Sequence, residues 1–588
     1  MPKINSVIIL HLLVCLASSL FAQVPHRASE LDCPVIETKL GNIAGIRQQT
    51  VLGNSSFCSY RGIRYAVAPV GKLRFKAPIP SGSWEGTYNA TEYGSACMQF
   101  NAYSTKSEDC LFLNVFVPEP SICSSSRDIA VIVFIHGGGF VAGAAYDDTI
   151  GPHLLLNKCV ILVTLHYRLA VFGFLPLALP EYSGNMGLKD QQLALEWINQ
   201  HISAFGGNPK QVTLMGQSAG GASVSFQRLN PKSRSYFKRA YVMSSSALSY
   251  YALSESNNKT DLVMELAKNQ NIAIENSDQL IKYLQTVDAN YLLSHTFQKN
   301  IGNYDLIFDV PWQPCVEPKT TSDPFISEHP ETLLSKPVNF PPTVYTYTSL
   351  ESISFAYDKI ANPEKISYLD TNFKFTLPFH GLDQEACKEE LAPIFTKIRR
   401  FYFGHAKINA SQILPFIQLI SSTDFSYSIQ KEVAIQALSR SEAKLRVLRV
   451  NLRTLLSLSL NQPGVAALAA TSHADDICSY FWCGSLSHIY KEIEAEETLL
   501  QQATVRTSKI LREILINFAI TGNPVSETAS FYSFPPVNSK PLTDLPFTEL
   551  LSVNTLASGS NPDHEEFKFW WSINEKVDKI KKMSCNQN

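Results

Sequence analysis

The chain has 588 residues, and its 50 Lys and Arg nearly balance its 52 Asp and Glu, for a formal net charge of -2. This balance argues against a nucleic-acid partner and against electrostatic attachment to a membrane surface. With 45% hydrophobic and 17% charged residues, the chain can bury a large core. Large α/β enzymes exceed the usual domain length as single units, so length alone does not require several domains.

The N-terminal residues have the tripartite form of a secretory signal. Lys3 precedes the apolar run 7–17, and small residues then lead to a predicted cleavage site after Ala22. The apolar run is shorter than the about 20 residues that a membrane span needs. Residues 581–588 are polar and carry neither a lipid-anchor tail nor an ER-retention signal. We expect the segment up to Ala22 to be removed and the rest to be exported without a membrane anchor.

Four N-X-S/T sequons agree with export. They begin at Asn54, Asn89, Asn258 and Asn409. N-glycosylation acceptors are expected on the surface of a secreted protein, but such short patterns also occur by chance. The sequons therefore support the signal segment and do not establish it.

Twelve cysteines are present, and loss of Cys15 with the signal leaves eleven. Because that number is odd, at least one thiol is expected to stay unpaired or to bond outside the chain. Cys159 begins the apolar run 159–165, so we expect it to be a buried small hydrophobe. Spacing leaves the other pairings open, including one between Cys33 and Cys58.

A glycine-rich loop follows the first strongly apolar segment. Residues 128–135 predict a buried strand, which runs directly into His136-Gly137-Gly138-Gly139. Successive glycines leave backbone N–H groups free to approach a substrate, as in an oxyanion hole of the HGGG type. An ordinary flexible loop is the alternative. The position of the loop after a strand, roughly 80 residues before the next motif, favours the oxyanion hole.

The next motif is G-x-S-x-G at residues 216–220, with Ser218 at its centre. Alone the pattern is weak, because these residues are common and often mark an ordinary helix entry. Here residues 211–215 predict a strand and Ala219–Leu229 a helix, as a nucleophile elbow requires. The flanking glycines suit the strained turn, and the helix N-terminus directs free amides at a developing oxyanion. Together the two motifs indicate half of an acyl-transfer site.

The chain resembles the type-B carboxylesterases, the carboxylesterase and cholinesterase branch of the α/β-hydrolases, and most of all the insect-type esterases. The likeness covers nearly the whole mature chain and is carried by residues 61–66, 69–75, 97–99, 107–114, 185–191 and 204–209, together with both motifs. It implies an α/β-hydrolase fold, with a mostly parallel central sheet flanked by helices. We expect a signal at 1–22 and a single domain over 23–588.

The resemblance also implies the residues of a serine esterase. Ser218 matches the nucleophile, His473 the general base and Glu351 the acid that orients the histidine. The oxyanion-hole donors are matched by the amides of Gly138, Gly139 and Ala219. Their chain order, Ser then Glu then His, is that of α/β-hydrolases. The implied reaction cleaves a small-molecule ester through an acyl-enzyme, with neither metal nor cofactor.

The residues alone leave more than one choice for the acid. Ser352 follows Glu351 where the family usually has glycine, and the nearby Asp358 and Asp323 are alternatives. Glu351 is preferred because residues 341–347 predict a strand that delivers it to the carboxyl edge of the sheet, where sites collect.

Two further departures bear on the substrate. Ser245 stands where the family has the glycine of Ser-Gly-Ser, and we expect it to narrow the space behind the histidine. Cys97 and Cys110 match the first disulfide loop of the family, but the loop lacks the tryptophan that holds choline in cholinesterases. Loop packing is the expected role of Phe100 and Tyr103 within it, so a choline ester is disfavoured.

Gln217 offers a local hint about the substrate. Most of the family has glutamate before the nucleophile, whereas glutamine resembles the juvenile hormone esterases, which cleave a methyl ester from a long apolar acid. Ala470 departs from the glycine usual in their histidine block. Such an esterase is therefore one alternative. Another, from a different class, is a cholinesterase-like adhesion protein without catalysis, which the retained Ser218, Glu351 and His473 disfavour.

Overall fold

The computed structural model describes residues 33–583, apart from 53–54, 101–104, 125–126, 178, 255, 257, 301–309, 311, 374–376, 378–386, 440–443, 463–464, 466–467, 469, 526–533, 538–545 and 553–554. The predicted signal segment and the first sequon, at Asn54, lie outside the described residues. So does Tyr103.

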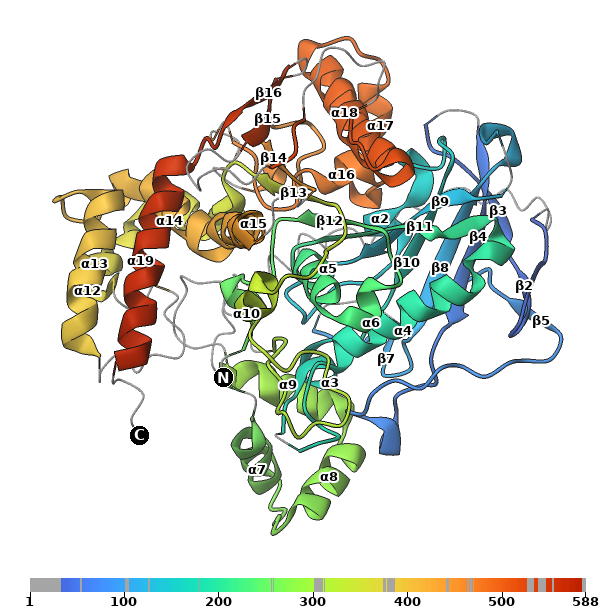
Figure 1. Ribbon diagram of the computed structural model, residues 1–588, viewed down its shortest axis with the longest axis horizontal. Helices are drawn as coiled ribbons and strands as arrows, with labels where there is room; N and C mark the ends of the chain where they lie inside the picture. Colours follow the sequence, from blue (N-terminus) through green and yellow to red (C-terminus); the bar gives the residue numbers. More distant parts are fainter. Residues whose placement is uncertain are drawn as a thin grey trace.

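An eleven-stranded sheet runs through the described residues (Figure 1). In spatial order its strands are β16 (Thr555–Ser560), β15 (Pro546–Ser552), β14 (Leu445–Val450), β13 (Thr343–Thr348), β12 (Arg239–Met243), β11 (Gly207–Gln217), β9 (Ile129–Ile135), β10 (Val160–Leu165), β8 (Phe112–Pro118), β4 (Ser56–Arg64) and β3 (Ile46–Gln49). Within the run from β15 to β10 in this order, each strand is parallel to the next. The outer pairings, β16 with β15 and β10 through β8 and β4 to β3, are antiparallel.

Smaller strands and many helices complete the described structure. The remaining strands are β1 (Ile36–Thr38), β2 (Gly41–Ala44), β5 (Thr87–Asn89), β6 (Ala96–Cys97) and β7 (Lys106–Ser107). The helices are α2 (Asp147–Ile150), α3 (Ala170–Phe174), α4 (Met186–His201), α5 (Ala219–Leu229), α6 (Pro231–Arg234), α7 (Thr260–Asn269), α8 (Ser277–Thr286), α9 (Ala289–Asn300), α10 (Pro330–Ser335), α11 (Tyr357–Ala361), α12 (Leu369–Asn372), α13 (Lys388–Phe403), α14 (Ile413–Ser421), α15 (Tyr427–Ser439), α16 (Ile477–Tyr480), α17 (Ser487–Ile493), α18 (Leu499–Thr521) and α19 (His564–Met583).

Strand β9 shows why the middle of the sheet is apolar on both faces. Its side chains alternate in direction, so that Val131 and Val133 join one core while Ile132 and Phe134 join another. Helices α4 and α5 cover the first face, and α18 covers the second. A strand buried on both faces reads as a continuous apolar run, as the parallel strands of α/β proteins do. The expectation of a mostly parallel sheet flanked by helices is confirmed.

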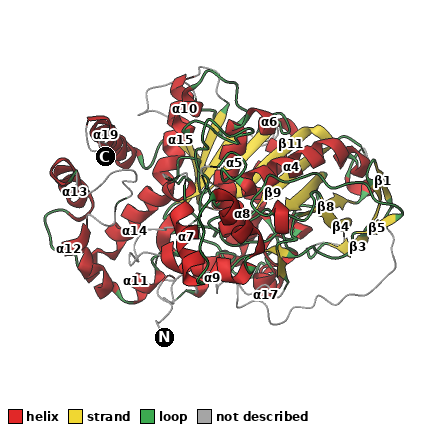
Figure 2. Cartoon of the chain, turned by 90° about the horizontal axis from the view of Figure 1, so that it is seen from below, coloured by secondary structure: helices red, strands yellow, loops and turns green. Residues whose placement is uncertain are grey.

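A third apolar core includes Ile353, which follows β13 in the chain. It joins α13, α14 and α19, and includes Phe403, Phe416 and Trp570. In Figure 2 these helices lie at the end of the molecule opposite to β3 and β4. No helix of the described residues is sufficiently long and apolar to span a bilayer.

Disulfides close loops of different lengths in the described residues, with sequence separations from 5 to 36. The pairs between described residues are Cys33–Cys58, Cys97–Cys110, Cys123–Cys159 and Cys478–Cys483, and Cys387 is also disulfide-bonded. The expectation for Cys159 is wrong, because it is half-buried and bonded to Cys123. Strand β10 begins only at Val160, so the cysteine stands just before the strand, where it bonds Cys123 in the connection that follows β8. Cys315 is the free thiol of the described residues.

Candidate active site

Ser218 lies at a sharp turn between β11 and α5. Its φ of 59° and ψ of -128° place a non-glycine residue in a strained region, which costs about 1–3 kcal/mol. A Cβ atom on Gly216 would lie 2.3 Å from the Gly220 carbonyl oxygen, and one on Gly220 would lie 2.0 Å from that of Ile135. Both glycines are therefore required by close backbone approach. The strand and helix predicted around Ser218 are present.

The His136-to-Gly139 loop follows β9 and packs against this turn. A Cβ atom on Gly137 would lie 2.9 Å from Ser218 Cβ, so the two segments are in contact. Gly138 and Gly139 have φ of 104° and 61°, conformations that favour glycine. Within the described residues, neither their amides nor that of Ala219 donate a hydrogen bond. These three donors are available to a ligand beside Ser218.

His136 itself supports the loop. It is buried, stacks on Tyr167 with ring centroids 4.5 Å apart, and its Nδ1 lies 2.9 Å from the Gly137 carbonyl. Tyr167 donates a hydrogen bond of 3.0 Å to the His136 carbonyl. Burial lowers the pKa of His136 to about 4, so the ring is neutral at physiological pH.

Glu351 and His473 are far apart in the sequence and form a hydrogen-bonded pair in the structure. Glu351 follows β13, is fully buried, and accepts a 2.7 Å hydrogen bond from the Thr348 amide. Its Oε2 atom lies 2.6 Å from His473 Nδ1, and its carbonyl accepts a 2.9 Å hydrogen bond from the His473 amide. The histidine is thus held by both side chain and backbone, which fixes the ring relative to the carboxylate.

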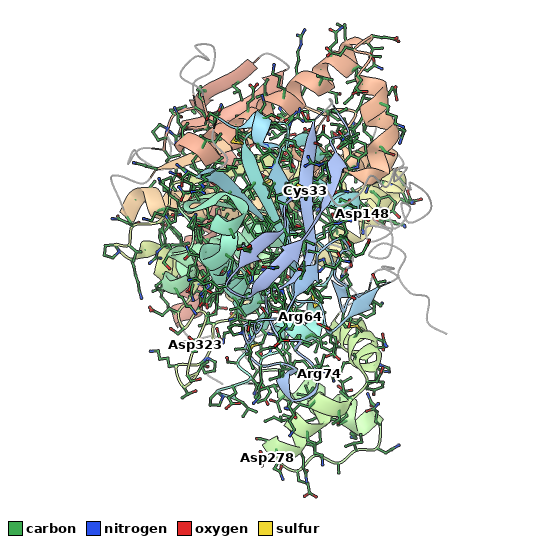
Figure 3. All side chains as sticks on the ribbon, turned by 90° about the vertical axis from the view of Figure 1, so that its right-hand side faces the viewer. Cys33, Arg64, Arg74, Asp148, Asp278 and Asp323 are labelled. Atoms are coloured by element: carbon green, nitrogen blue, oxygen red, sulfur yellow. A yellow bond between two sulfur atoms is a disulfide. The ribbon has the colours of Figure 1, made fainter. Side chains whose placement is uncertain are left out.

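The two alternative acids lie in other surroundings. Asp358 pairs with Lys359 at 3.0 Å and with Lys365 at 3.5 Å. Asp323 is exposed to solvent (Figure 3). Glu351 is the carboxylate that contacts His473 in the described residues.

The imidazole is enclosed by aromatic rings. Phe425 and Phe355 lie 4.5 Å and 5.4 Å from the His473 ring centroid, and the histidine side chain is 8% exposed. Phe425 belongs to a π-helical turn, Ser422–Ser426, between α14 and α15. Such turns often occur at functional sites. The sequence pattern did not single out either phenylalanine.

Gln217 occupies the other side of the histidine. Its Nε2 atom lies 3.1 Å from His473 Nε2. If Nδ1 carries the proton that bonds Glu351, then Nε2 accepts from the Gln217 amide, and this tautomer leaves Nε2 as a base. Within the described residues Ser218 makes no hydrogen bond to His473, and its side chain is 5% exposed as part of a buried turn. The structure places Ser218, Gln217, Glu351 and His473 in one small region.

Asp476 is a further acidic group near this region. Both of its carboxylate oxygens are buried and without a hydrogen-bond partner in the described chain. Burial, and then the charge of Glu351, raise the pKa of Asp476 to about 7. The neighbouring Asp475 is instead satisfied by Ser459 and Ser472. The sequence pattern identified His473 but gave no signal for Asp476, because an exposed and a buried aspartate look alike in sequence.

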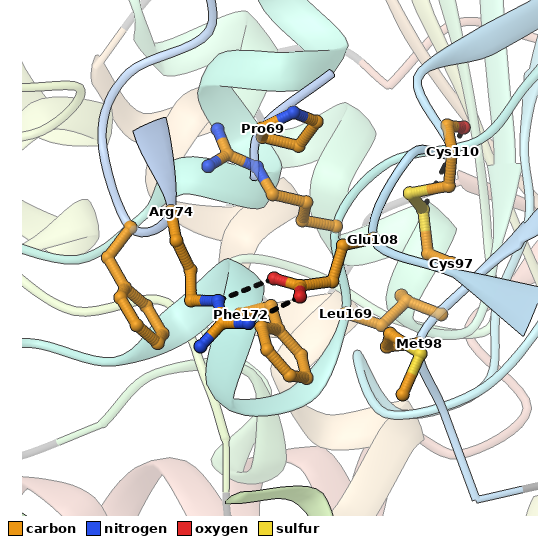
Figure 4. A pocket seen from close by; sticks show the side chains of 10 residues that line it. Pro69, Arg74, Cys97, Met98, Glu108, Cys110, Leu169 and Phe172 are labelled. Carbon is orange, nitrogen blue, oxygen red and sulfur yellow. Dashed lines mark hydrogen bonds and ion pairs between the residues drawn. A yellow bond between two sulfur atoms is a disulfide. The ribbon is translucent and has the colours of Figure 1, made fainter. Parts of the chain in front are cut away.

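The loop closed by Cys97 and Cys110 lies beside a small cavity (Figure 4). Arg74 pairs with Glu108 there and donates 2.8 Å hydrogen bonds to the carbonyls of Leu284 and Val287, tying the loop to α8. The cavity, about 10 Å³, has room for no more than one water molecule, so it is no ester site. Phe100 packs against the main core, as expected for loop packing.

Three of the predicted sequons lie on the described surface. Asn89, Asn258 and Asn409 are exposed, which is the position that N-glycosylation requires.

Residues 32–570 match the model of a family described as the carboxylesterase family. The chain belongs to this family. It is 30% identical over 510 residues to a juvenile hormone esterase of Tribolium castaneum, covering 84% of each chain. It is 28% identical over 562 residues to venom carboxylesterase-6 of Apis mellifera, covering 92% of this chain and 94% of that protein.

A solved structure supports the fold. The juvenile hormone esterase of Manduca sexta, with OTFP covalently attached, has a TM-score of 0.78, 24% identity, and covers 92% of this chain and 99% of its own. The architecture is the α/β-hydrolase fold, and membership of the family makes the protein a carboxylic ester hydrolase. The resemblance to type-B carboxylesterases of the insect type is confirmed.

Proposed function

We propose that the protein is a secreted serine carboxylesterase that uses Ser218, His473 and Glu351. Ser218 attacks the ester carbonyl while His473 Nε2 takes its proton and returns it to the leaving alcohol. Glu351 holds the imidazole in the required tautomer and stabilises its charged form. Water then repeats the cycle on the acyl-enzyme. The observation that carries this proposal is the 2.6 Å contact of Glu351 with His473 beside the strained Ser218 turn.

The amides of Gly138, Gly139 and Ala219 are proposed to form the oxyanion hole. They come from two segments in contact with each other, and each lacks another acceptor in the described residues. One such donor contributes about 3 kcal/mol to stabilisation of the tetrahedral intermediate. The positive end of the α5 dipole adds to this effect, because Ala219 is the first residue of the helix.

A covalent-labelling experiment tests the proposal. Purified protein is incubated with p-nitrophenyl acetate for turnover, and with diethyl p-nitrophenyl phosphate for labelling. We expect a burst of p-nitrophenol and a phosphoryl adduct that peptide mass spectrometry places on Ser218. Turnover without an adduct on Ser218, or an adduct elsewhere, would refute the assignment of the nucleophile.

A second candidate concerns the substrate. Gln217 precedes the proposed nucleophile, and one relative is a juvenile hormone esterase. Together these favour hydrolysis of a methyl ester of a long apolar acid. Turnover of juvenile hormone is to be compared with that of short acetate esters and long acyl esters. A kcat/KM for juvenile hormone no higher than for p-nitrophenyl acetate would exclude this candidate.

Secretion is supported by the disulfides, because such bonds persist in oxidising compartments. The exposed Asn89, Asn258 and Asn409 are consistent with it. Expression of the full chain in insect cells tests this proposal. We expect protein in the medium that begins at Gln23 and loses mass on treatment with an N-glycosidase.

A further inference from the structure

Tyr251 lies next to the proposed nucleophile but has no part in the mechanism above. It belongs to a short 3-10 turn, Tyr250–Ala252, after β12, and is fully buried. Its ring is 5.6 Å from that of Phe425, which packs on His473. The phenol donates a 2.7 Å hydrogen bond to Ser245 Oγ. Burial raises the pKa of Tyr251, and the hydroxyl groups of Ser245 and then Ser218 act against that rise, so both serines are polar neighbours of the phenol.

Ser245 begins a chain of buried hydroxyl groups. It donates a 3.1 Å hydrogen bond to Ser249 Oγ, which lies 2.7 Å from Ser428 Oγ. Ser428 in turn donates a 2.7 Å hydrogen bond to the Phe425 carbonyl. A carbonyl oxygen only accepts, and each hydroxyl has a single proton. The carbonyl at the end thus fixes the direction of the whole chain, with every proton pointing away from Ser218.

The direction of these hydrogen bonds determines whether the Tyr251 hydroxyl can donate to Ser218 or only accept from it. Its proton is committed to Ser245, so it presents only a lone pair on the side of Ser218. Burial raises the pKa of Tyr251, so the phenol stays protonated and keeps this arrangement. On the other side of the site, the Gln217 amide occupies His473 Nε2. His473 therefore has Gln217 as its partner, Ser218 has Tyr251 as its polar neighbour, and Ser218 and His473 do not hydrogen-bond each other in the described residues.

We propose that Tyr251, anchored by Ser245, is a positioning residue that accepts the Ser218 hydroxyl proton in the resting enzyme and keeps Ser218 disengaged from His473 until an ester enters. The inference rests on the proposed function, because it takes Ser218 as the nucleophile. It also gives Ser245 a role. The Ser245 hydroxyl accepts the Tyr251 hydrogen bond and anchors the phenol.

Three variants test the proposal through acylation of Ser218. Tyr251→Phe removes the competing acceptor, and Ser245→Ala frees the Tyr251 proton to turn toward Ser218 Oγ. Each is expected to raise the rate constant for phosphorylation of Ser218 by diethyl p-nitrophenyl phosphate roughly three- to tenfold, the effect of one hydrogen bond. The dissociation constant of the probe should not change. The double variant should be no faster than Tyr251→Phe alone, because that change already breaks the chain.

Tyr241→Phe is the matched control. Tyr241 is equally buried, and its hydroxyl meets that of Tyr480 at 2.9 Å in the other core. Loss of this phenol should leave the phosphorylation rate unchanged. The thermal unfolding midpoint of every variant is measured to show that the variant is folded.

The outcomes separate the inference from the proposed function. Folded Tyr251→Phe and Ser245→Ala proteins that react at the wild-type rate or more slowly would overturn the role of Tyr251, while leaving Ser218 as nucleophile. Additive effects in the double variant would also overturn it. A wild-type protein and Tyr251→Phe that both lack a Ser218 adduct would overturn the proposed function and, with it, this inference.

Discussion

The side-chain nitrogen of Gln217 lies 3.1 Å from Nε2 of His473, the atom that is proposed to accept the proton of the adjacent Ser218. The opposite ring nitrogen is held 2.6 Å from Glu351. Both ring nitrogens thus have polar partners before any substrate is present. The contact with a neutral carboxamide, rather than a carboxylate, has consequences for the pH dependence of the enzyme.

Gln217→Glu should move the acidic limb of the kcat/KM profile to higher pH by about one unit or more. The amide N–H of Gln217 stabilises the neutral ring, whereas a carboxylate at the same place stabilises the charged ring, which is no base. The change preserves the shape of the side chain. Initial rates with p-nitrophenyl acetate between pH 5 and 9 measure it. An unshifted limb would show that Gln217 does not bind His473 in solution.

Ser218→Ala should abolish turnover, by about 10⁴-fold or more, and leave the thermal midpoint near that of the wild type. The reason is that the hydroxyl is the proposed attacking group, whereas loss of one oxygen atom leaves the backbone of the turn between β11 and α5 in place. Hydrolysis of p-nitrophenyl acetate and labelling by the organophosphate are the readouts. Near-normal turnover by the variant would require another nucleophile.

Glu351→Gln should lower kcat by about 10³- to 10⁴-fold, because the ring would lose the charge that fixes its tautomer. Asp358→Asn is the control, since that carboxylate pairs with Lys359 and Lys365. Single-turnover acylation rates compare the two variants. If Asp358→Asn caused the large loss and Glu351→Gln did not, the assignment of the acid would be reversed.

Asp476→Asn should stabilise the protein above neutral pH. Burial raises the folded-state pKa of Asp476 to about 7, from its ordinary value of 3.8, so its contribution to stability is fully present only below the unfolded pKa and is lost progressively as the pH rises from there to about 7. An amide carries no charge at either pH. Thermal midpoints of wild type and variant at pH 5 and 8.5 test this, and the gain should appear at pH 8.5.

The neighbouring Asp475→Asn serves as the contrast. Asp475 accepts hydrogen bonds from Ser459 and Ser472, so its loss should destabilise the protein at both pH values. If Asp476→Asn instead lowered the thermal midpoint at pH 8.5, the Asp476 carboxylate would have hydrogen-bond partners in solution.

Gly220→Ala should prevent accumulation of folded protein. The added methyl group would lie 2.0 Å from the Ile135 carbonyl, and neither the helix nor the strand can yield without moving Ser218. Gly82→Ala is the control, because nothing lies within 4 Å of its added Cβ atom. Yields of soluble protein and circular dichroism compare the two. Equal yields would mean that the turn adapts more easily than its contacts indicate.

The sequence predicted best those features that local chemistry dictates. The strands predicted at 128–135 and 211–215 are present as β9 (Ile129–Ile135) and β11 (Gly207–Gln217), because their apolar side chains are buried on both sheet faces, and Ala219–Leu229 is a helix with the predicted bounds. The glycines at 216 and 220 predict a close backbone approach, and the structure shows it. The strand predicted at 341–347 places Glu351 at the sheet edge, and the Glu351 side chain contacts His473.

Other features depend on contacts that no local pattern contains. The partner of Cys159 lies 36 residues earlier, in a loop without a strand or helix signal of its own. Tyr251 and Phe425 reach the site only when two segments fold against each other. Asp476 differs from its neighbour by the absence of hydrogen-bond donors around it, which is a property of the folded state.

The double link between Glu351 and His473 spans 122 residues of sequence. An intermediate in which the segment around His473 has not docked would contain the elbow and the glycine loop, yet lack the proposed base. Recovery of Ser218 reactivity during refolding would therefore report the docking of this segment rather than the pairing of β9 through β13. Under the proposed mechanism, Ser218 is a chemical reporter for the completion of folding.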